Sequence, residues 1–502
     1  MAKTLLMVNM DSKLKDEFES ICKVVGMKTT EAIVKFANDV VENQCMHFEK
    51  EKEYGGLTMD EVSDNGYKEY KEHHYEKAFE CWLYAANHNH VPSQHWLGHM
   101  YQYGIGVESD VMRAVEWYRK AADQGHGISQ YLLGLMFEKG DGLAQNYNEA
   151  IKWYHKAADG GNAQAQYQLG SVYYHGNGVD KNDVEAFKWF LLAANQGHAE
   201  SQNYLGIMYD HGFGVPQDCK KAVEWFSMAA EQGEVYAQGN LGIMYQNGRG
   251  VEPDYAEAIR LYSLAAEKDD YYAKYYLGIM YQNGFGVDVD YDKAVKLYRD
   301  SAEMGYLYAQ TQLAFMYRQG IGVEKNHDEA VKWYRRAAEQ GYAEAQCELG
   351  RMYELGDGVP IDSVEALYWI RTAANQNYVF AQETIADAYC NGYYGLQKDN
   401  RETYRWFQMA ANNGSTVAKW NLGYMYENGL GVEKDDYKAY TWYLLAANEG
   451  DTQAIIDLGL CYYYGRGVIR NEKESLKWLE KAAEKGSETA KEKIRELFVG
   501  NQ

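Results

Sequence analysis

The sequence predicts an all-α protein, a right-handed α/α superhelical solenoid of about 11–12 helix-turn-helix repeats, preceded by a small N-terminal module. Two observations on the 502 residues carry this prediction. The chain has 48 Gly but only 4 Pro, which favours helices punctuated by regular turns. An internal period of 36 residues, lengthened once to 37, is typical of helical repeat arrays. It is marked by Leu-Gly pairs or close variants at 97, 133, 169, 205, 241, 277, 313, 349, 385, 422 and 458.

Apolar residues three and four apart predict two amphipathic helices, A and B, in each repeat. In the unit 237–278 the expected apolar face of helix A is Ala237, Leu241, Met244 and Tyr245, and that of helix B is Ala256, Ile259, Leu261, Tyr262 and Ala265. Gly248 and Gly250 are expected to cap helix A, and Asp254 to cap helix B. Gly242 is expected to let the two backbones approach. Since neither helix can bury its face alone, the repeats must stack.

Both ends of the array depart from the repeat pattern. The first unit, 67–87, has no G-x-G turn, and 487–498 is predicted as a polar capping helix. We therefore divide the chain into an N-terminal module at 1–48, a charged linker at 49–60 and the solenoid at 61–502.

The repeat pattern A-x-A-Q-x-x-L-G-x-M-Y, followed by a G-x-G turn, resembles the Sel-one-like repeat (SLR) family, which is related to tetratricopeptide repeats. The resemblance covers roughly residues 60–500. It implies protein–protein interaction, with helix A lining a concave face. In the tetratricopeptide register the expected partner-binding residues are Tyr131, Leu135, Tyr167, Ile207, Ile243, Tyr275, Ile279, Phe315, Arg351, Trp420 and Tyr424. Two alternatives remain open: these residues belong to the core, or the face closes on a second copy of the chain.

The first fifty residues have a different composition, without Trp, Tyr or Pro. They predict a strand at 4–10 followed by two helices, and a lone strand favours a dimer. The segments 8–15 and 25–33 resemble a ribbon-helix-helix domain of the RelB/DinJ antitoxin type. The resemblance implies dimerisation through Leu6, Val8 and Met10 and possible DNA contacts from Asn9 and Lys3. The segment has 7 Lys and no Arg against 8 acidic residues, so dimerisation is the better supported of the two.

The charge of −23 and the pI near 5.1 argue against extensive nucleic-acid binding and against attraction to anionic membranes. The seven cysteines form no CxxC pair, which is typical of reduced thiols, and no apolar stretch is long enough to span a bilayer. A cytoplasmic location is therefore predicted.

No metal, cofactor or catalytic site is predicted. His88, His90, His95 and His99 lie close in sequence, but no cysteine completes a zinc set. Residues 288–299 imitate the first ligands of a calcium loop, but lysine and arginine stand where glycine and glutamate are required.

The sequence as a whole favours a non-enzymatic bacterial scaffold that captures a protein or peptide partner and dimerises through residues 1–48. The alternative is an antitoxin-like DNA-binding regulator whose solenoid holds a toxin or another partner.

Overall fold

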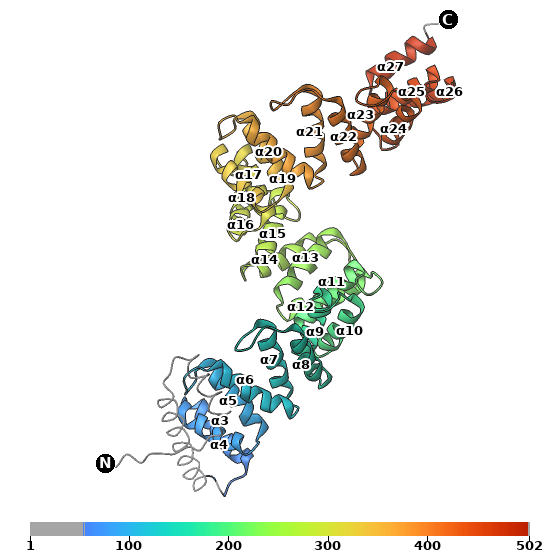
Figure 1. Cartoon of the computed structure of the whole chain (residues 1–502). Coiled ribbons are helices and arrows are strands. Elements are labelled where there is room, and N and C mark those ends of the chain that lie inside the picture. Colours follow the sequence, from blue (N-terminus) through green and yellow to red (C-terminus); the bar gives the residue numbers. More distant parts are fainter. Residues whose placement is uncertain (1–53, 55, 500–502) are drawn as a thin grey trace, which may run out of the picture. The chain divides into compact units, whose positions relative to one another are not determined.

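The computed structural model describes residue 54 and residues 56–499, so the predicted ribbon-helix-helix module at 1–48 lies outside the described residues. Within them the secondary structure consists of 25 α-helices and a terminal π-helical turn, with no β-strand. The all-α helical repeat array is thus confirmed for this part of the chain. The described residues fall into two compact units, which are divided between residues 234 and 235; Figure 1 labels the helices of both. The right-handed superhelix stays a prediction.

The first unit contains five helical hairpins. Their first helices, which we call helices A, are α3 (Met59–Lys71), α5 (Val91–Tyr103), α7 (Gly127–Lys139), α9 (Ala163–His175) and α11 (Ala199–His211). Their second helices, called helices B, are α4 (Tyr75–Asn87), α6 (Val111–Asp123), α8 (Tyr147–Asp159), α10 (Asp183–Asn195) and α12 (Cys219–Glu231). Helix α3 starts inside the predicted linker, where Thr58 and Glu61 form a capping box.

The second unit contains seven hairpins and a final helix. Its helices A are α13 (Val235–Asn247), α15 (Tyr271–Asn283), α17 (Leu307–Gln319), α19 (Ala343–Leu355), α21 (Val379–Asn391), α23 (Thr416–Asn428) and α25 (Thr452–Tyr464). Its helices B are α14 (Tyr255–Ala266), α16 (Tyr291–Glu303), α18 (His327–Glu339), α20 (Ser363–Asn375), α22 (Asn400–Asn412), α24 (Asp436–Asn448) and α26 (Glu472–Glu484). None of the described helices has the length and apolar character needed to cross a bilayer.

Within each unit, helix A packs against helix B of its own repeat, and helix B packs against helix A of the next repeat. The last hairpin is covered by α27 (Glu488–Ile494) and the π-helical turn Arg495–Val499. Ala490 is buried there, and Ile494, Leu497 and Phe498 pack against the core of α24–α26. The predicted capping helix is therefore present.

The turn chemistry agrees with the sequence. Gly248 and Gly250 have φ of 64° and 72°, the left-handed conformation that glycine adopts most easily. The Asp254 carboxylate accepts the Glu257 N–H at 3.0 Å and caps α14. In the first hairpin, which lacks G-x-G, His73 takes the positive φ.

In most repeats the glycine of the Leu-Gly pair faces an aromatic ring of helix B, which the sequence did not indicate. A Cβ on Gly242 would lie 2.6 Å from Tyr262 Cε1, and one on Gly278 would lie 2.7 Å from Tyr298 Cε1. The glycine therefore makes room for a buried ring, and in other repeats also for the backbone of helix B: a Cβ on Gly350 would lie 2.9 Å from the Ala366 carbonyl oxygen. Each hydroxyl donates back to helix A, Tyr262 to Gln246 at 2.8 Å and Tyr298 to Gln282 at 2.6 Å.

One core residue of helix B was also predicted wrongly. Ala256 is exposed, and Ala258 is buried in its place. Ala258 lies one turn before Tyr262 and two turns before Ala265, on the side of α14 that faces α13. Ala256 lies two residues away and therefore points to the opposite side of the helix.

The glutamine of the A-x-A-Q pattern joins three consecutive helices. In α17, Gln310 is buried, and its Nε2 donates to the Ala302 carbonyl at the end of α16, 3.1 Å away. Its Oε1 accepts the Gln340 Nε2 after α18, also at 3.1 Å. A buried amide left without partners would cost about 1–3 kcal/mol, so these bonds hold the repeats in register.

Candidate functional site

Each helix A exposes one stripe of side chains. The stripe runs through the second, sixth, ninth and thirteenth positions of the helix, a spacing that places residues on one side of an α-helix. In α17 these positions are Tyr308, Gln312, Phe315 and Gln319, and in α23 they are Val417, Asn421, Tyr424 and Asn428; all are exposed or half-buried. We call the surface formed by these stripes the A-helix face.

The ninth position of helix A is the best placed of the predicted binding positions. Phe315 is 38% exposed and Tyr424 is 46% exposed. None of the other predicted residues at this position is fully buried. They are Leu135, Ile207, Ile243, Ile279 and Arg351.

The fifth position of helix A carries half-buried residues in some repeats and buried residues in others. Tyr131, Tyr167, Tyr275 and Trp420 are half-buried, and each also packs against a core cluster. At the same position other repeats carry buried residues, such as Cys347. This position therefore lies at the edge of the A-helix face, and partner binding by these four residues stays a prediction.

The second position of helix A was missed by the sequence analysis, although it carries large exposed apolar side chains. The residue that precedes the Ala-Gln of the repeat pattern marks it, so the period could have located it. The tetratricopeptide register omitted it. The exposed apolar residues at this position are Ile128, Tyr236, Tyr308, Phe380 and Val417.

Charged side chains of α17 and α19 meet beside an aromatic ring of α21. Arg318 Nη1 contacts Glu348 at 2.7 Å, and Arg351 Nη1 contacts the other oxygen of Glu348 at 2.9 Å. The Arg351 guanidinium also lies over the Phe380 ring, 5.7 Å from its centroid. The predicted residue Arg351 is thus held between a carboxylate on α19 and an aromatic ring on α21.

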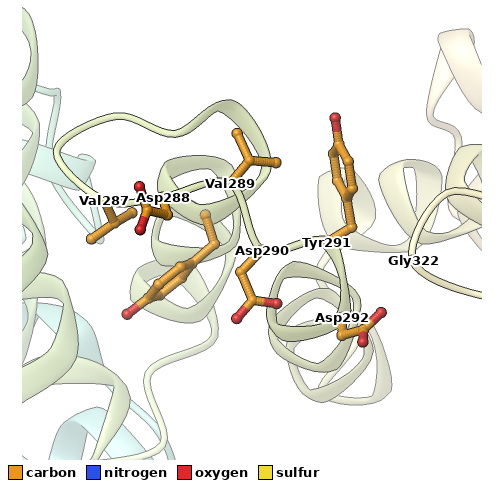
Figure 2. Close-up of a pocket in the computed structure, with 8 residues that line it drawn as sticks. Val287, Asp288, Val289, Asp290, Tyr291, Asp292 and Gly322 are labelled. Atoms are coloured by element: carbon orange, nitrogen blue, oxygen red, sulfur yellow. The ribbon is translucent and has the colours of Figure 1, made fainter.

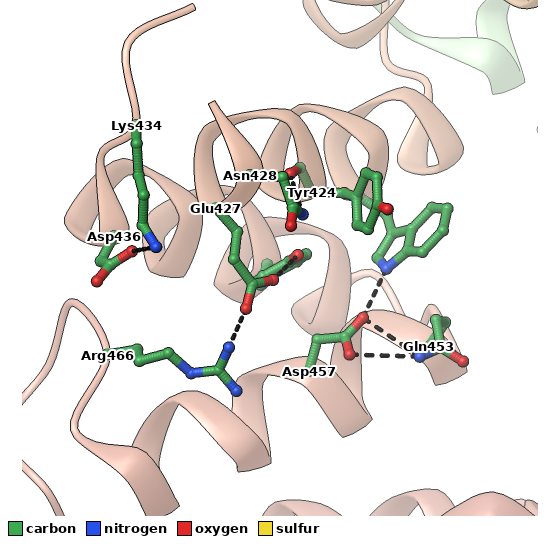
Figure 3. A network of polar contacts seen from close by, with 10 residues as sticks. Tyr424, Glu427, Asn428, Lys434, Asp436, Gln453, Asp457 and Arg466 are labelled. Atoms are coloured by element: carbon green, nitrogen blue, oxygen red, sulfur yellow. Dashed lines mark hydrogen bonds and ion pairs between the residues drawn. The ribbon is translucent and has the colours of Figure 1, made fainter. Parts of the chain in front are cut away.

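A polar network connects α23 with α25 (Figure 3). Trp420 Nε1 donates to Asp457 Oδ2 at 2.8 Å, and the Trp420 ring stacks on that of Tyr424 with centroids 6.2 Å apart. Burial raises the pKa of Asp457, and nearby Glu427 adds to the effect. Glu427 pairs with Arg466. The indole N–H is therefore used inside the protein, and Tyr424 carries the exposed aromatic surface.

The Sel1 repeat profile matches this chain twelve times. The matched residues are 74–90, 91–126, 127–162, 163–198, 199–234, 235–270, 272–306, 307–342, 343–378, 380–415, 416–451 and 452–487. The chain belongs to the Sel1 repeat family. Sel1 repeat proteins generally mediate protein–protein interaction and are typically non-enzymatic.

Two solved structures are similar to this chain. The chain is 35% identical to a protective antigen of uropathogenic Escherichia coli that displays an SLR fold, over 84% of this chain and 91% of that chain, with a TM-score of 0.59. It is 36% identical to a Sel1 repeat protein from Oxalobacter formigenes, over 49% of this chain and 99% of that chain, with a TM-score of 0.46. No curated protein matches the chain.

Three histidines have a structural role in these Sel1 repeats that the sequence analysis missed. His90, His126 and His198 are the N-caps of α5, α7 and α11. In each case the imidazole Nδ1 accepts the backbone N–H of the serine three residues later, at 3.4, 3.3 and 3.2 Å. The recurring His-x-x-Ser spacing is the signal that could have shown it.

Of the other histidines of this region, His88 and His95 lie within hydrogen-bond distance of protein groups, whereas the buried Nδ1 of His99 has no hydrogen-bond partner among the described residues. His88 Nδ1 lies 2.8 Å from the Tyr84 carbonyl, and His95 Nδ1 lies 3.1 Å from Ser129 Oγ. Burial, together with nearby His126 and His99, lowers the pKa of His95 to about 4. In the part of the chain that the structure describes, one group of three metal-ligand side chains has its ligand atoms within 4.8 Å, namely Glu69, Glu72 and His74.

The three aspartates at 288, 290 and 292 line an open pocket of about 630 Å³ beside Gly322 (Figure 2). Figure 2 shows their carboxylates apart from one another. Asp290 is used as the N-cap of α16, where it accepts the Lys293 N–H at 2.9 Å. These side chains therefore do not gather around a common point.

Proposed function

We propose that this protein is an interaction scaffold that captures a protein or peptide partner on its A-helix face. The observation that carries the proposal is the set of exposed apolar side chains on three helices A of the second unit, α17, α21 and α23. Tyr308 and Phe315 lie on α17, Phe380 on α21, and Val417 and Tyr424 on α23. Aromatic and aliphatic side chains exposed together are typical of interface cores.

The helices B expose apolar residues as well, among them Val364 and Tyr368 of α20, but their second position is not apolar in the neighbouring helices B. Val364 of α20 is 77% exposed, whereas the same position carries Asp328 in the preceding helix B and Arg401 in the following one. On helices A, the corresponding position is Tyr in α13, α15 and α17. The A-helix face is therefore the surface on which apolar contacts can continue from repeat to repeat.

Replacing two apolar residues of the A-helix face is expected to abolish partner recovery. Phe315→Ser with Tyr424→Ser removes exposed rings from α17 and α23 and should leave folding intact, because neither ring is buried. The measurement is quantitative recovery of co-purifying protein from the native host with the full chain as bait. Val364→Ser with Tyr437→Ser is the matched control, since it removes two exposed residues of helices B. Equal recovery by both double variants would refute the proposal.

The N-terminal module is part of the proposal, although it lies outside the described residues. We propose that residues 1–48 form a dimer through Leu6, Val8 and Met10, and that the protein is cytoplasmic and bacterial. The alternative is an antitoxin-like DNA-binding regulator, in which Asn9 and Lys3 contact DNA. The absence of a basic excess in the first fifty residues, which have 7 Lys and no Arg against 8 acidic residues, is what favours dimerisation alone.

Deleting residues 1–50 is expected to convert a dimer into a monomer in a solution mass measurement. The full chain is expected to show no sequence-specific DNA affinity in a mobility-shift assay. A monomeric full chain in the mass measurement would contradict the proposed dimer. A sequence-specific, salt-dependent shift that the deletion abolishes would establish the alternative.

A further inference from the structure

Among the helices A of the second unit, acidic residues occur only in the last four. The helices α19, α21, α23 and α25 together carry seven acidic residues against two basic ones. The helices α13, α15 and α17 carry no acidic residue and two basic ones. Within the second unit, the helices A therefore change from tyrosine-rich in α13, α15 and α17 to acidic in α19, α21, α23 and α25.

The basic residues of the acidic part are already paired. Arg351 contacts Glu348, and Lys419 contacts Glu449. Among the described residues, no cation pairs with Glu383 or Asp387 of α21; Glu383 instead accepts a hydrogen bond from the Ser415 hydroxyl. Partial burial, together with Glu383 one turn away, raises the pKa of Asp387. Two like charges on one side of a helix repel each other, so a cation bound there would be stabilised.

An aromatic ring lies beside these carboxylates. Phe380 precedes Glu383 by three residues and Asp387 by seven, so all three lie on one side of α21. The Phe380 ring is 45% exposed although the Arg351 guanidinium already lies over it. A ring flanked by carboxylates is a favourable site for a lysine or arginine side chain, through cation–π attraction and charged hydrogen bonds.

We propose that Phe380, Glu383 and Asp387, together with Tyr424 on the next helix A, dock a basic segment of a partner protein. A lysine or arginine of that segment contacts the two carboxylates, and an apolar residue beside it packs on the Phe380 and Tyr424 rings. This inference rests on the proposed function and specifies the chemistry of the partner. The uncompensated negative charge favours a basic protein segment over a nucleic acid or an anionic membrane.

The test is selection of binding segments from a display library of random peptides, with the full chain as the target. Enriched peptides are expected to combine an excess of Lys and Arg with aromatic or aliphatic residues. Glu383→Gln with Asp387→Asn should weaken the best peptide about tenfold, as the loss of a charge-assisted contact would. The control, Glu324→Gln with Asp328→Asn, changes the same charge at the same spacing on exposed residues off the A-helix face.

Three results would overturn the inference: enriched peptides without basic excess, unchanged affinity in the Glu383/Asp387 variant, or equal weakening by the control. The last would indicate general attraction to a chain of charge −23. The proposed function is tested separately by Phe315→Ser with Tyr424→Ser. If that variant loses the host partner while the Glu383/Asp387 variant keeps it, the A-helix face remains the binding surface and only the basic segment is refuted.

Discussion

Tyr298→Ala is expected to lower the free energy of unfolding of the second unit by about 3–5 kcal/mol, the range for truncating a buried aromatic residue. The Tyr298 side chain is fully buried. Its ring fills the space left by Gly278, where even a Cβ would lie 2.7 Å from it. Alanine would leave a cavity between α15 and α16 that these helices could close only by moving closer together, and Gln282 would lose one of its two hydrogen bonds.

Tyr298→Phe is the matched variant, because it keeps the ring and removes only the hydroxyl. It is expected to cost about 1 kcal/mol, the net value of one hydrogen bond. Phe190 and Phe226 occupy the same position in other repeats, so phenylalanine fits. Urea unfolding, with hydrogen exchange followed on α15–α17, measures both variants. A cost of Tyr298→Ala within 1 kcal/mol of Tyr298→Phe would show that the ring does not hold the hairpin together.

The first unit is expected to lose stability as the pH falls from about 6.5 to 4. Burial lowers the pKa of His126 and His198, and it contributes most to lowering the pKa of His95 to about 4. In this pH window the unfolded chain binds more protons than the folded one, so the free energy of unfolding falls as the pH falls; the full stability is present above about pH 6.5.

The structural cause is the N-cap role of His126 and His198. An imidazolium carries a proton on both nitrogens, so Nδ1 can no longer accept the serine N–H, and a cation is unfavourable at a helix N-terminus. Losing one cap costs about 1 kcal/mol. Charging His95 in its buried surroundings costs on the order of 3 kcal/mol, from the displacement of its pKa.

Non-titrating replacements taken from other repeats test this directly. Asn162 caps α9, so His126→Asn and His198→Asn should keep the caps, and His95→Tyr copies the residue at the same position of α7. The triple variant is expected to lose most of the pH dependence of hydrogen exchange in α5–α11 between pH 7.5 and 5. His175→Asn with His211→Asn, which replaces two exposed histidines, is the control. If the pH dependence of hydrogen exchange is unchanged in the triple variant, these three histidines are not its cause.

The 36-residue period predicted most of the fold because the same turn and cap residues recur in each repeat. The glycines after helix A and Asp254 before helix B are short-range signals, and the structure places them where they were expected. The neighbour of Gly242 could not be predicted, because an absent side chain makes room equally well for a backbone or a ring. Ala256 was chosen wrongly as a core residue, since the spacing of four residues to Tyr262 and seven to Ala265 favours Ala258.

The candidate site was predicted in part. The tetratricopeptide register, which predicted Phe315 and Tyr424, omits the second position of helix A, so the exposed residues Phe380 and Val417 were missed. The pairing of Arg318 with Glu348 joins residues 30 apart on neighbouring helices A, and only the stacking of repeats brings them together. The histidine caps were missed because histidine is an unusual cap and its ring suggested metal chemistry instead.

Site-specific photo-crosslinking in the native host tests binding on the A-helix face most directly. A photo-reactive phenylalanine analogue replaces Phe315 or Tyr424 on helices A, and Val364 or Tyr437 on helices B, one position at a time. All four side chains are exposed, so each variant should fold. The prediction is that positions 315 and 424 crosslink to the same protein and positions 364 and 437 do not. Adducts from the helices B alone, or none from positions 315 and 424, would contradict a partner bound on the A-helix face.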